Sequence, residues 1–411
     1  MRILFLAHRI PYPPDKGEKI RAYHELKFLG GRHSVDLFCF ADSRAEAEQE
    51  RGLRGLCRSI YVETRGKSTV AAGAVRSILR GEPLSCGCFF SHRFKDKIDQ
   101  ALATETYDVI FVFCSIMAQY IPLPAPAPMV MDFVDVDSAK WAQYAERSRL
   151  PLSWLFKREA RELARYEKKL VCASSSTIVT TVQEARLLHG DEIPPVKVIG
   201  NGVELPTARA EGPPPYILAL QPYVLFVGTM NYLPNVDAVE YFAKDIFPRV
   251  RHRHPELKFV IAGRDPSRRV RRLARQVGIV VTGGVPEVNT YLAGSRAVVA
   301  PFRIAQGIQN KLLEALAAGK PVVSSSGPAA AIGAAHGTDL LVADTPAEFA
   351  SAIVSVLEDP ELYFRFNCGP EFVRRNFSWC EKLDKLELLL QRAANPHLRI
   401  EQEALDRAEA F

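Results

Sequence analysis

Short apolar runs alternate with longer amphipathic stretches along most of this 411-residue chain. An apolar run between turn residues is typical of a buried strand, and apolar residues every three or four positions are typical of a helix. In the first half the pattern predicts strands over Ile3–Ala7, Val35–Phe40, Ile60–Val62, Val109–Phe113, Val130–Phe133, Thr177–Thr181 and Val196–Ile199. It predicts helices over Lys19–Gly30, Arg44–Cys57, Thr69–Leu79, His92–Ala103, Ala139–Ala173 and Gln183–Leu188. Strands that are apolar throughout and separated by helices indicate a parallel sheet covered on both faces.

The pattern changes at residues 205–217, which are rich in proline and lack periodicity, and we interpret them as a linker. Beyond them the alternation resumes, with predicted strands over Tyr223–Val227, Lys258–Ala262, Gly278–Val281, Ala297–Ala300, Pro321–Ser324 and Leu340–Ala343. The predicted helices are Asn235–His252, Arg268–Val277, Val285–Ala293, Ile308–Ala318, Pro346–Glu358 and Cys380–Ala394.

This organisation predicts an α/β protein of two doubly wound, Rossmann-like domains. We place an N-terminal domain at 1–204, a C-terminal domain at 218–380, and a terminal helix and tail at 381–411 that pack back toward the N-terminal domain. Ligands of such sheets bind at the carboxyl ends of the strands, and we expect these ends to face each other across a cleft.

Composition narrows the class of protein. Hydrophobic residues make up 47% of the chain and charged residues 24%, as in ordinary globular proteins, and the net charge is a modest +6. No basic platform interleaved with aromatic residues is present, so we expect no nucleic-acid partner. No G-x-G-x-x-G motif follows the first strand, which disfavours a nicotinamide or flavin enzyme.

Cysteine usage and hydropathy indicate the cellular compartment of the protein. None of the eight cysteines forms a CxxC pair, which disfavours a zinc site and fits a reducing compartment. No apolar run approaches the length of a membrane-spanning helix, and the apolar start is too short for a signal peptide. We therefore expect a cytoplasmic location.

One strand–turn–helix unit carries candidate chemistry. The apolar strand Ala297–Ala300 leads into a polar turn that opens a helix. Backbone N–H groups at Gly307–Gln309 would be free at the helix start, where the dipole favours an anion. Lys311 and Glu314 are three residues apart and so share a face of the helix. A cation for phosphate and a carboxylate for a sugar diol indicate a nucleotide site, although an ordinary unit with a solvated Lys/Glu pair is the alternative.

Four segments together resemble a known family: Pro11–Gly17, Val198–Glu204, Phe226–Val239 and Gln306–Val323. They are similar to the first loop, the asparagine–glycine–valine segment, the opening of the C-terminal domain and the donor-site helix of glycosyltransferase family 4, the retaining GT-B sugar transferases. The resemblance covers nearly the whole chain and looks closest to bacterial exopolysaccharide sugar transferases associated with PEP-CTERM/exosortase loci. It implies a GT-B fold and a nucleotide-diphospho-sugar donor as co-substrate, with no further cofactor.

The sequence departs from the family pattern at two places. The family often carries two Glu residues with seven residues between them; Glu314 holds the second position and Gln306 stands at the first. Gln306 keeps two hydrogen-bonding functions but has no charge, which puts in doubt any scheme that needs an anion there. The Arg and Lys that hold the diphosphate in many members are replaced by Thr229 and Pro234.

The resemblance assigns roles to the remaining polar residues. Lys311, then Arg264 and Arg303, would neutralise charge on the leaving diphosphate, and Glu314 would accept hydrogen bonds from both ribose hydroxyls. The catalytic candidates are Lys311, Arg264, Asp135 and Gln306. The donor-binding candidates are Gly17, Gly228, Asn231, Arg303, Gly307, Ile308 and Glu314. Gly17 and Asn231 also fit plain turn and loop positions.

Asp135 follows the strand Val130–Phe133, where the family commonly has a His or Asp that faces the donor sugar. Asp132 and Asp137 are rivals for this role, and Asp137 with Ser138 would also serve as a helix N-cap. Asp135 and Asp137 have Asp-x-Asp spacing, but they lie on the acceptor side of the GT-B pattern, so we expect no metal.

Two basic segments have open interpretations. Arg21 and His24 are interpreted as helix surface or acceptor contacts. Residues 139–173 are long and basic, with Trp141, Trp154 and other apolar residues interleaved. They could lie on an anionic membrane that carries a lipid-linked acceptor, or form a buried helix pair with an exposed basic face.

The sequence thus predicts a metal-independent, retaining glycosyltransferase that uses a nucleotide sugar and a glycan or lipid-linked acceptor in exopolysaccharide or cell-surface glycan synthesis. It would work in the cytoplasm, with peripheral contact at the inner face of the plasma membrane. A GT-B sugar-nucleotide epimerase is one alternative. A non-catalytic GT-B subunit that binds nucleotide sugar is another, favoured by the departures at Gln306, Thr229 and Pro234.

Overall fold

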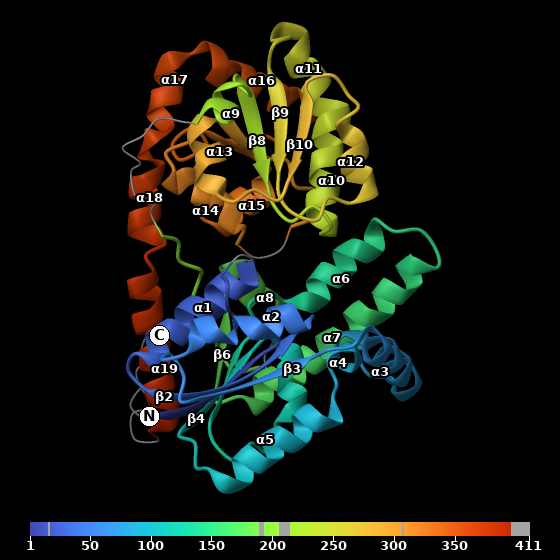
Figure 1. Ribbon diagram of the computed structural model, residues 1–411, viewed down its shortest axis with the longest axis vertical. Coiled ribbons are helices and arrows are strands. Elements are labelled where there is room, and N and C mark those ends of the chain that lie inside the picture. The colour runs from blue at the N-terminus through green and yellow to red at the C-terminus, as the bar shows by residue number, and fades with distance from the viewer. Residues whose placement is uncertain (15–16, 189–192, 205–213, 306–307, 396–411) are drawn as a thin grey trace. The chain divides into compact units, whose positions relative to one another are not determined.

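The computed structural model describes residues 1–14, 17–188, 193–204, 214–305 and 308–395. The chain forms two compact units, one of Met1–Gly200 together with the chain from Cys380, and one of Asn201–Trp379. Each unit is built on one parallel sheet flanked by helices (Figure 1). The predicted fold class, two doubly wound Rossmann-like domains, is therefore confirmed.

The N-terminal unit has a seven-stranded sheet in the order β3-β2-β1-β4-β5-β6-β7. Its strands are β1 (Arg2–Ala7), β2 (Ser34–Ala41), β3 (Ser59–Thr64), β4 (Val109–Phe113), β5 (Met129–Asp132), β6 (Ser176–Val179) and β7 (Val196–Val198). Its helices are α1 (Gly17–Gly30), α2 (Arg44–Ala47), η1 (Glu48–Leu53), α3 (Lys67–Arg80), α4 (Leu84–Cys88), α5 (His92–Thr104), η2 (Ser115–Tyr120), α6 (Asp137–Glu146), α7 (Leu152–Ala173) and α8 (Val182–Leu187). The strand order reverses between β1 and β4, so a crevice is expected at their carboxyl ends.

The C-terminal unit has a six-stranded sheet in the order β10-β9-β8-β11-β12-β13. Its strands are β8 (Tyr223–Val227), β9 (Lys258–Ala262), β10 (Ile279–Gly283), β11 (Ala297–Ala300), β12 (Val322–Ser324) and β13 (Leu341–Val342). Its helices are α9 (Pro215–Leu218), α10 (Leu233–Tyr241), η3 (Phe242–Ile246), α11 (Phe247–Arg253), α12 (Arg268–Leu273), α13 (Val288–Gly294), α14 (Asn310–Ala317), α15 (Ser326–Ala331), α16 (Pro346–Glu358), α17 (Pro360–Arg365), η4 (Phe366–Cys368) and α18 (Gly369–Asn376). Here the order reverses between β8 and β11.

The central strands are buried along their whole length. Residues 3–7 of β1, 109–113 of β4 and 259–262 of β9 have almost no exposed surface. Continuous burial, without alternation, follows from coverage of both sheet faces. The rings of Phe5 and Phe111 meet edge to face on adjacent strands, with their centres 4.9 Å apart. Burial of such a side chain contributes about 1.5–3 kcal/mol.

Two predicted helices are interrupted at prolines. The predicted helix 139–173 is a pair, because α6 ends at Glu146 and α7 begins after Pro151. The predicted helix 235–252 contains a π-helical turn, η3, just before Pro248. Proline has no N–H to donate and clashes with the preceding turn, which breaks or distorts a continuous helix.

The predicted helix Arg44–Cys57 ends early, as α2 and the 3-10 helix η1, at Leu53. Gly55 has φ of +88°, a conformation that no helix continues through. Gly52 lies against the Tyr12 ring, where a Cβ atom would be only 2.3 Å away. The chain therefore turns in this region.

The chain ends and the junction are partly described. The last helix, α19 (Trp379–Ala394), belongs from Cys380 onward to the N-terminal unit, and its Glu387 carboxylate lies 3.2 Å from His33 Nε2 and 3.4 Å from Arg32 Nε. Residues 205–213 of the predicted linker and residues 396–411 lie outside the described part. Ile217, in α9, is fully buried in the core of the C-terminal unit.

Candidate functional site

Three side chains meet at the switch point of the C-terminal sheet, which is the place between β8 and β11 where the strand order reverses. Phe226 belongs to β8, Phe302 follows β11, and Lys311 lies in the first turn of α14. The Lys311 ammonium lies 4.6 Å from the centre of the Phe302 ring and 5.4 Å from that of Phe226. The amine therefore rests on aromatic faces at the place where doubly wound sheets bind ligands.

Asn235 fixes the position of this amine. Lys311 Nζ donates to Asn235 Oδ1 at 2.6 Å, and Asn235 Nδ2 donates to the Thr229 carbonyl at 2.9 Å. Asn235 lies on α10 with only 3% of its surface exposed. A Cβ atom at Gly228 would come within 2.6 Å of Asn235 Nδ2. Gly228 thus allows the loop after β8 to close on the asparagine that holds Lys311.

The Lys311–Glu314 pair occupies an unusual electrostatic setting. The core-facing residues of α14, including Leu312 and Leu313, are fully buried, which leaves Lys311 and Glu314 on its half-buried flank. Burial lowers the pKa of Lys311 to about 7 and raises the pKa of Glu314 to about 7, and each charge partly opposes the other's shift.

The Glu314 carboxylate has unused hydrogen-bonding capacity. Among the described residues, none donates a hydrogen bond to it. An ionised carboxylate only accepts hydrogen bonds. The Glu314 carboxylate can accept hydrogen bonds from hydroxyl groups, and the neighbouring Lys311 amine can pair with an anion. Together they suit a ligand that carries both.

Backbone contacts lock the ends of β8 and β9 together. The Gly228 N–H donates to the Ala262 carbonyl at 3.1 Å, and the Met230 N–H donates to the Arg264 carbonyl at 2.9 Å. A Cβ atom at Gly263 would lie 1.7 Å from the Gly228 carbonyl oxygen. Arg264, a predicted diphosphate ligand, is therefore held on the loop next to the one that carries Gly228.

Arg303, a third predicted phosphate ligand, is bound to α10. Its Nε and Nη2 donate to the two carboxylate oxygens of Asp237 at 3.0 and 2.6 Å. Its guanidinium also lies 4.6 Å from the centre of the Tyr241 ring. A donor phosphate at Arg303 would have to compete with Asp237.

The other predicted donor-binding residues differ in their burial and in whether the structure describes them. Asn231 is exposed in the loop after β8, and Ile308 is half-buried against the core of the C-terminal unit. Gln306 and Gly307 lie outside the described residues. The predicted asparagine–glycine–valine segment contacts the start of α14, because Asn201 Nδ2 donates to Asn310 Oδ1 at 2.9 Å.

In the N-terminal unit, Arg21 and Asp132 form a buried ion pair. Arg21 is 1% exposed, and its Nε and Nη2 donate to Asp132 Oδ2 at 2.8 and 2.6 Å. Its Nη1 donates to the Ile199 carbonyl at 2.9 Å, and Glu25 lies 3.0 Å away. The prediction that Arg21 lies on the helix surface is wrong, because the guanidinium instead ties α1 to β5.

Two residues with strained backbone conformations lie just after the carboxyl ends of β4 and β5. Val134 has φ of +64° and Cys114 has φ of +76°, both unfavourable for residues with a Cβ atom. Asp132 holds both turns, since its Oδ1 accepts the Val134 N–H and its carbonyl accepts the Cys114 N–H, each at 2.8 Å. Strain of this kind, about 1–3 kcal/mol per residue, clusters at functional sites.

Asp135 follows this strained turn. Burial raises its pKa to about 7, with the carboxylates of Glu184 and Asp137 adding to the shift and Lys140 opposing it. Asp137 forms an ion pair with Lys140, while Val136 occupies the N-cap position of α6. The predicted N-cap role of Asp137 is therefore wrong. A carboxyl that titrates near neutral pH can take up or release a proton.

Two further N-terminal residues come between β1 and the body of α1 in the chain. His8 follows β1 and stacks on Phe113 of β4, with the ring centres 6.1 Å apart. Burial lowers the pKa of His8 to about 3, so the ring is neutral. Gly17 is the first residue of α1.

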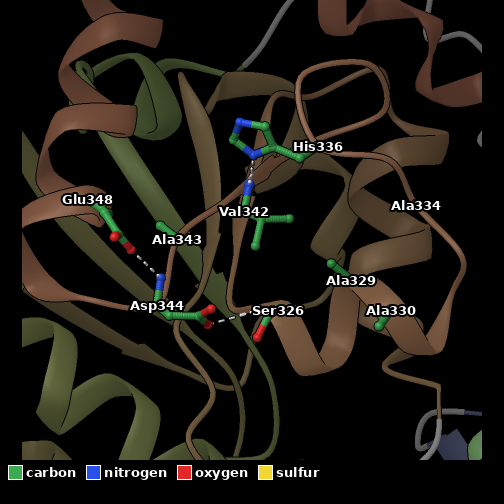
Figure 2. Close-up of a pocket in the computed structure, with 9 residues that line it drawn as sticks. All are labelled: Ser326, Ala329, Ala330, Ala334, His336, Val342, Ala343, Asp344 and Glu348. Carbon is green, nitrogen blue, oxygen red and sulfur yellow. Dashed lines mark hydrogen bonds between the residues drawn. The ribbon is translucent and has the colours of Figure 1, made fainter.

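A shallow pocket lies farther along the carboxyl edge of the C-terminal sheet, beside β12 and β13 (Figure 2). Asp344 accepts the Ser326 N–H at 2.9 Å, Glu348 accepts the Asp344 N–H at 2.9 Å, and His336 Nδ1 accepts the Val342 N–H at 2.9 Å. These contacts hold the β13–α16 turn together. We assign no ligand to this pocket.

In the part of the chain that the structure describes, no group of three or more His, Cys, Asp or Glu residues could hold a metal ion. None of the described helices has both the length and the apolar character needed to cross a bilayer.

The geometry at β8 and β11 can be compared with known proteins. Residues 221–359 match the family of glycosyl transferases group 1. The matched range contains Gly228, Asn235, Lys311 and Glu314. No curated protein matches the chain.

Solved structures match over nearly the whole chain. HepE of Anabaena in complex with UDP has a TM-score of 0.64 at 17% identity, covering 95% of this chain and 100% of that one. Sucrose-phosphate synthase of Thermosynechococcus elongatus has a TM-score of 0.71 at 15% identity, covering 95% and 98%. A UDP-forming trehalose-phosphate synthase of Burkholderia vietnamiensis has a TM-score of 0.64 at 15% identity, covering 95% and 100%. With the group 1 match, these likenesses show the GT-B fold class.

Sequence reasoning missed the support of the site. Asn235 and Phe226 stood out only as parts of a longer segment, and no role was predicted for Phe302. One signal was available for Asn235, a polar residue among the apolar positions that open α10. No sequence pattern indicated the pairing of Arg21 with Asp132, which are 111 residues apart.

Proposed function

We propose that this protein is a retaining glycosyltransferase that moves a sugar from a nucleotide-diphospho-sugar to an acceptor hydroxyl in exopolysaccharide or other cell-surface glycan synthesis. The strongest support is the Lys311–Glu314 pair, which lies at the switch point of the C-terminal sheet and inside the group 1 match. Retention and the glycan pathway are supported by the sequence resemblance alone.

The proposed donor site uses complementary groups. The diphosphate would lie against Lys311, with Arg264 on the adjacent loop, and its negative charge would keep the Lys311 amine protonated. Both ribose hydroxyls would donate to Glu314, which has no described donor. UDP is the first nucleotide to test, because the Anabaena structure contains UDP and the Burkholderia synthase is described as UDP-forming.

The acceptor, a glycan or a lipid-linked saccharide, would bind to the N-terminal unit. Asp135 is the proposed group for proton transfer there, because its pKa of about 7 allows both protonation states at neutral pH. The protein would work without a metal, with Lys311 and Arg264 balancing the charge of the leaving diphosphate.

The test is incubation of the purified full-length protein with UDP-sugars, with and without a panel of glycan and lipid-linked acceptors. We expect UDP release that depends on an acceptor, together with a glycosylated product of retained anomeric configuration. Conversion of the sugar nucleotide without an acceptor would instead identify an epimerase. Binding without turnover across the panel would identify a non-catalytic subunit.

A further inference from the structure

Helix α3 of the N-terminal unit exposes its large apolar side chains to solvent instead of burying them against the protein. Leu79 is 82% exposed, Val75 58% and Ile78 48%. They are spaced three and four residues apart and therefore share one face of the helix. The protein-facing side carries small residues instead: Gly73 packs so closely on Gly87 of α4 that a Cβ atom would lie 1.9 Å from the Gly87 carbonyl oxygen.

The start of α7 extends the same apolar surface. Trp154 is 63% exposed. Trp154 and Ile78 line one shallow groove between the two helices. Arg158 fixes this arrangement, because its Nη2 donates to the Ser77 carbonyl at 3.3 Å and to the Glu82 carbonyl at 3.2 Å.

The other aromatic residues of this region are not part of the surface. Trp141, Tyr144 and Phe156 pack on one another between α6 and α7, with ring centres 5.1–6.2 Å apart. The core between α6 and α7 is therefore well packed, and the exposed apolar residues of α3 and α7 are not part of it. We call Val75, Ile78, Leu79 and Trp154 the α3–α7 surface.

Basic residues surround the α3–α7 surface. Residues 69–82 and 147–161 together contain seven Lys and Arg residues and only two Glu residues. One of these two, Glu159, is buried and accepts the Leu84 and Ser85 N–H groups at 2.6 and 2.9 Å, so it offers no charge to a partner. Arg80, Arg149 and Lys157 are exposed, and Arg161 is exposed but pairs with Glu162 at 2.9 Å.

We propose that the α3–α7 surface docks on the surface of an anionic lipid bilayer. Exposed aliphatic residues and a tryptophan can enter the boundary between headgroups and acyl chains, while the surrounding cations meet anionic headgroups. The cores of protein interfaces are instead depleted of charged residues, so the exposed cations Arg80, Arg149 and Lys157 favour a membrane over a protein partner. This surface is independent of the nucleotide site.

The test is sedimentation of the full-length protein with phosphatidylglycerol vesicles and, separately, with phosphatidylcholine vesicles. We expect binding to the anionic vesicles that weakens as salt is added, since salt screens the headgroup charges. Each of Leu79→Ser and Trp154→Ser should weaken binding about tenfold, because each removes apolar surface from the bilayer. Trp154 emission should also shift to shorter wavelength on anionic vesicles, and this shift should be absent in Trp154→Phe.

The matched control is a pair of equally exposed apolar residues in the C-terminal unit, Val277 at 76% and Phe364 at 65%. Val277→Ser and Phe364→Ser should leave vesicle binding unchanged. Absence of binding to anionic vesicles, or equal loss with the control variants, would overturn the proposal. So would a wild-type dimer in light scattering that Leu79→Ser dissociates, because the surface would then cover a second copy of the chain. UDP binding, measured on the same samples, reports separately on the nucleotide site.

Discussion

At the scale of single residues, Lys311 is the most informative group, because burial lowers its pKa to about 7 and leaves it largely neutral in alkaline solution. A diphosphate beside Nζ favours the ammonium form and raises this pKa. UDP binding at about pH 8 should therefore bring a proton onto the protein, and affinity should fall as the pH rises above 7. Calorimetry in two buffers of different ionisation enthalpy measures the proton uptake.

The control for this experiment is Lys311→Met, which removes the titrating group. Binding to the variant should be weaker and should take up no proton at the same pH. Equal proton uptake by the variant and the wild type would show that another group titrates.

Glu314 should determine selectivity for the ribose. Glu314→Gln keeps the shape of the side chain but removes its charge, and a hydrogen bond to a charged group contributes about 1.5–3 kcal/mol. We expect UDP affinity to fall roughly tenfold or more, and the preference for UDP over 2′-deoxy-UDP to shrink. Glu348→Gln, a change of the same kind in the β13–α16 turn, should leave both quantities unchanged. A preference for UDP that survives in Glu314→Gln would remove Glu314 from the ribose site.

At the scale of elements, the Arg21–Asp132 pair holds α1 to β5 in the N-terminal unit. Removing one partner of a buried ion pair leaves an uncompensated charge and costs about 3–5 kcal/mol. Arg21→Met should lower the free energy of unfolding by this amount at neutral pH, because it leaves the buried Asp132 carboxylate without its cation. Arg32→Met, at a half-exposed arginine of the same region, should cost less than about 1 kcal/mol. Urea unfolding of the three proteins, wild type included, at neutral pH measures both losses.

The junction of β8 and β9 makes a second prediction at this scale. Gly263→Ala places a Cβ atom against the Gly228 carbonyl, so the two strand ends must separate. We expect a loss of about 2–3 kcal/mol in stability and a clear loss of UDP affinity. Gly327→Ala is the matched control, since nothing lies within 4 Å of its new Cβ atom. Unchanged UDP affinity in a folded Gly263→Ala protein would separate this junction from the site.

The sequence predicted the strands of both sheets well, because their apolar runs are uninterrupted and leave little choice of period. Helix ends were harder. Pro151 and Pro248 each interrupt a stretch whose amphipathic pattern continues on both sides of the proline. The hydrophobic pattern does not register the helical hydrogen bond that is lost because proline has no N–H. Short helices such as α4 escaped because their stability comes from tertiary contacts, here Glu159 of α7 at the first N–H groups of α4.

At the scale of the whole molecule, the division into two doubly wound units followed from the alternation of elements and the proline-rich stretch between them. The placement of Lys311 and Glu314 on one helix was also predictable, because they are three residues apart in an amphipathic stretch. Their support by Asn235, Phe226 and Phe302 depends on contacts between distant segments, which no local pattern encodes. The same holds for the α3–α7 surface, whose two parts lie far apart in sequence.

The central claim is that the switch point between β8 and β11 binds a nucleoside diphosphate through Lys311. The most direct test is calorimetric titration of UDP into the wild type, Lys311→Met and Lys320→Met. Lys320 is a suitable control because it lies beyond the other end of α14, where its Nζ donates to the Ala293 carbonyl at 2.6 Å. The account predicts that UDP binds the wild type and Lys320→Met alike and binds Lys311→Met at least tenfold more weakly. Equal UDP affinity in Lys311→Met and the wild type would contradict it.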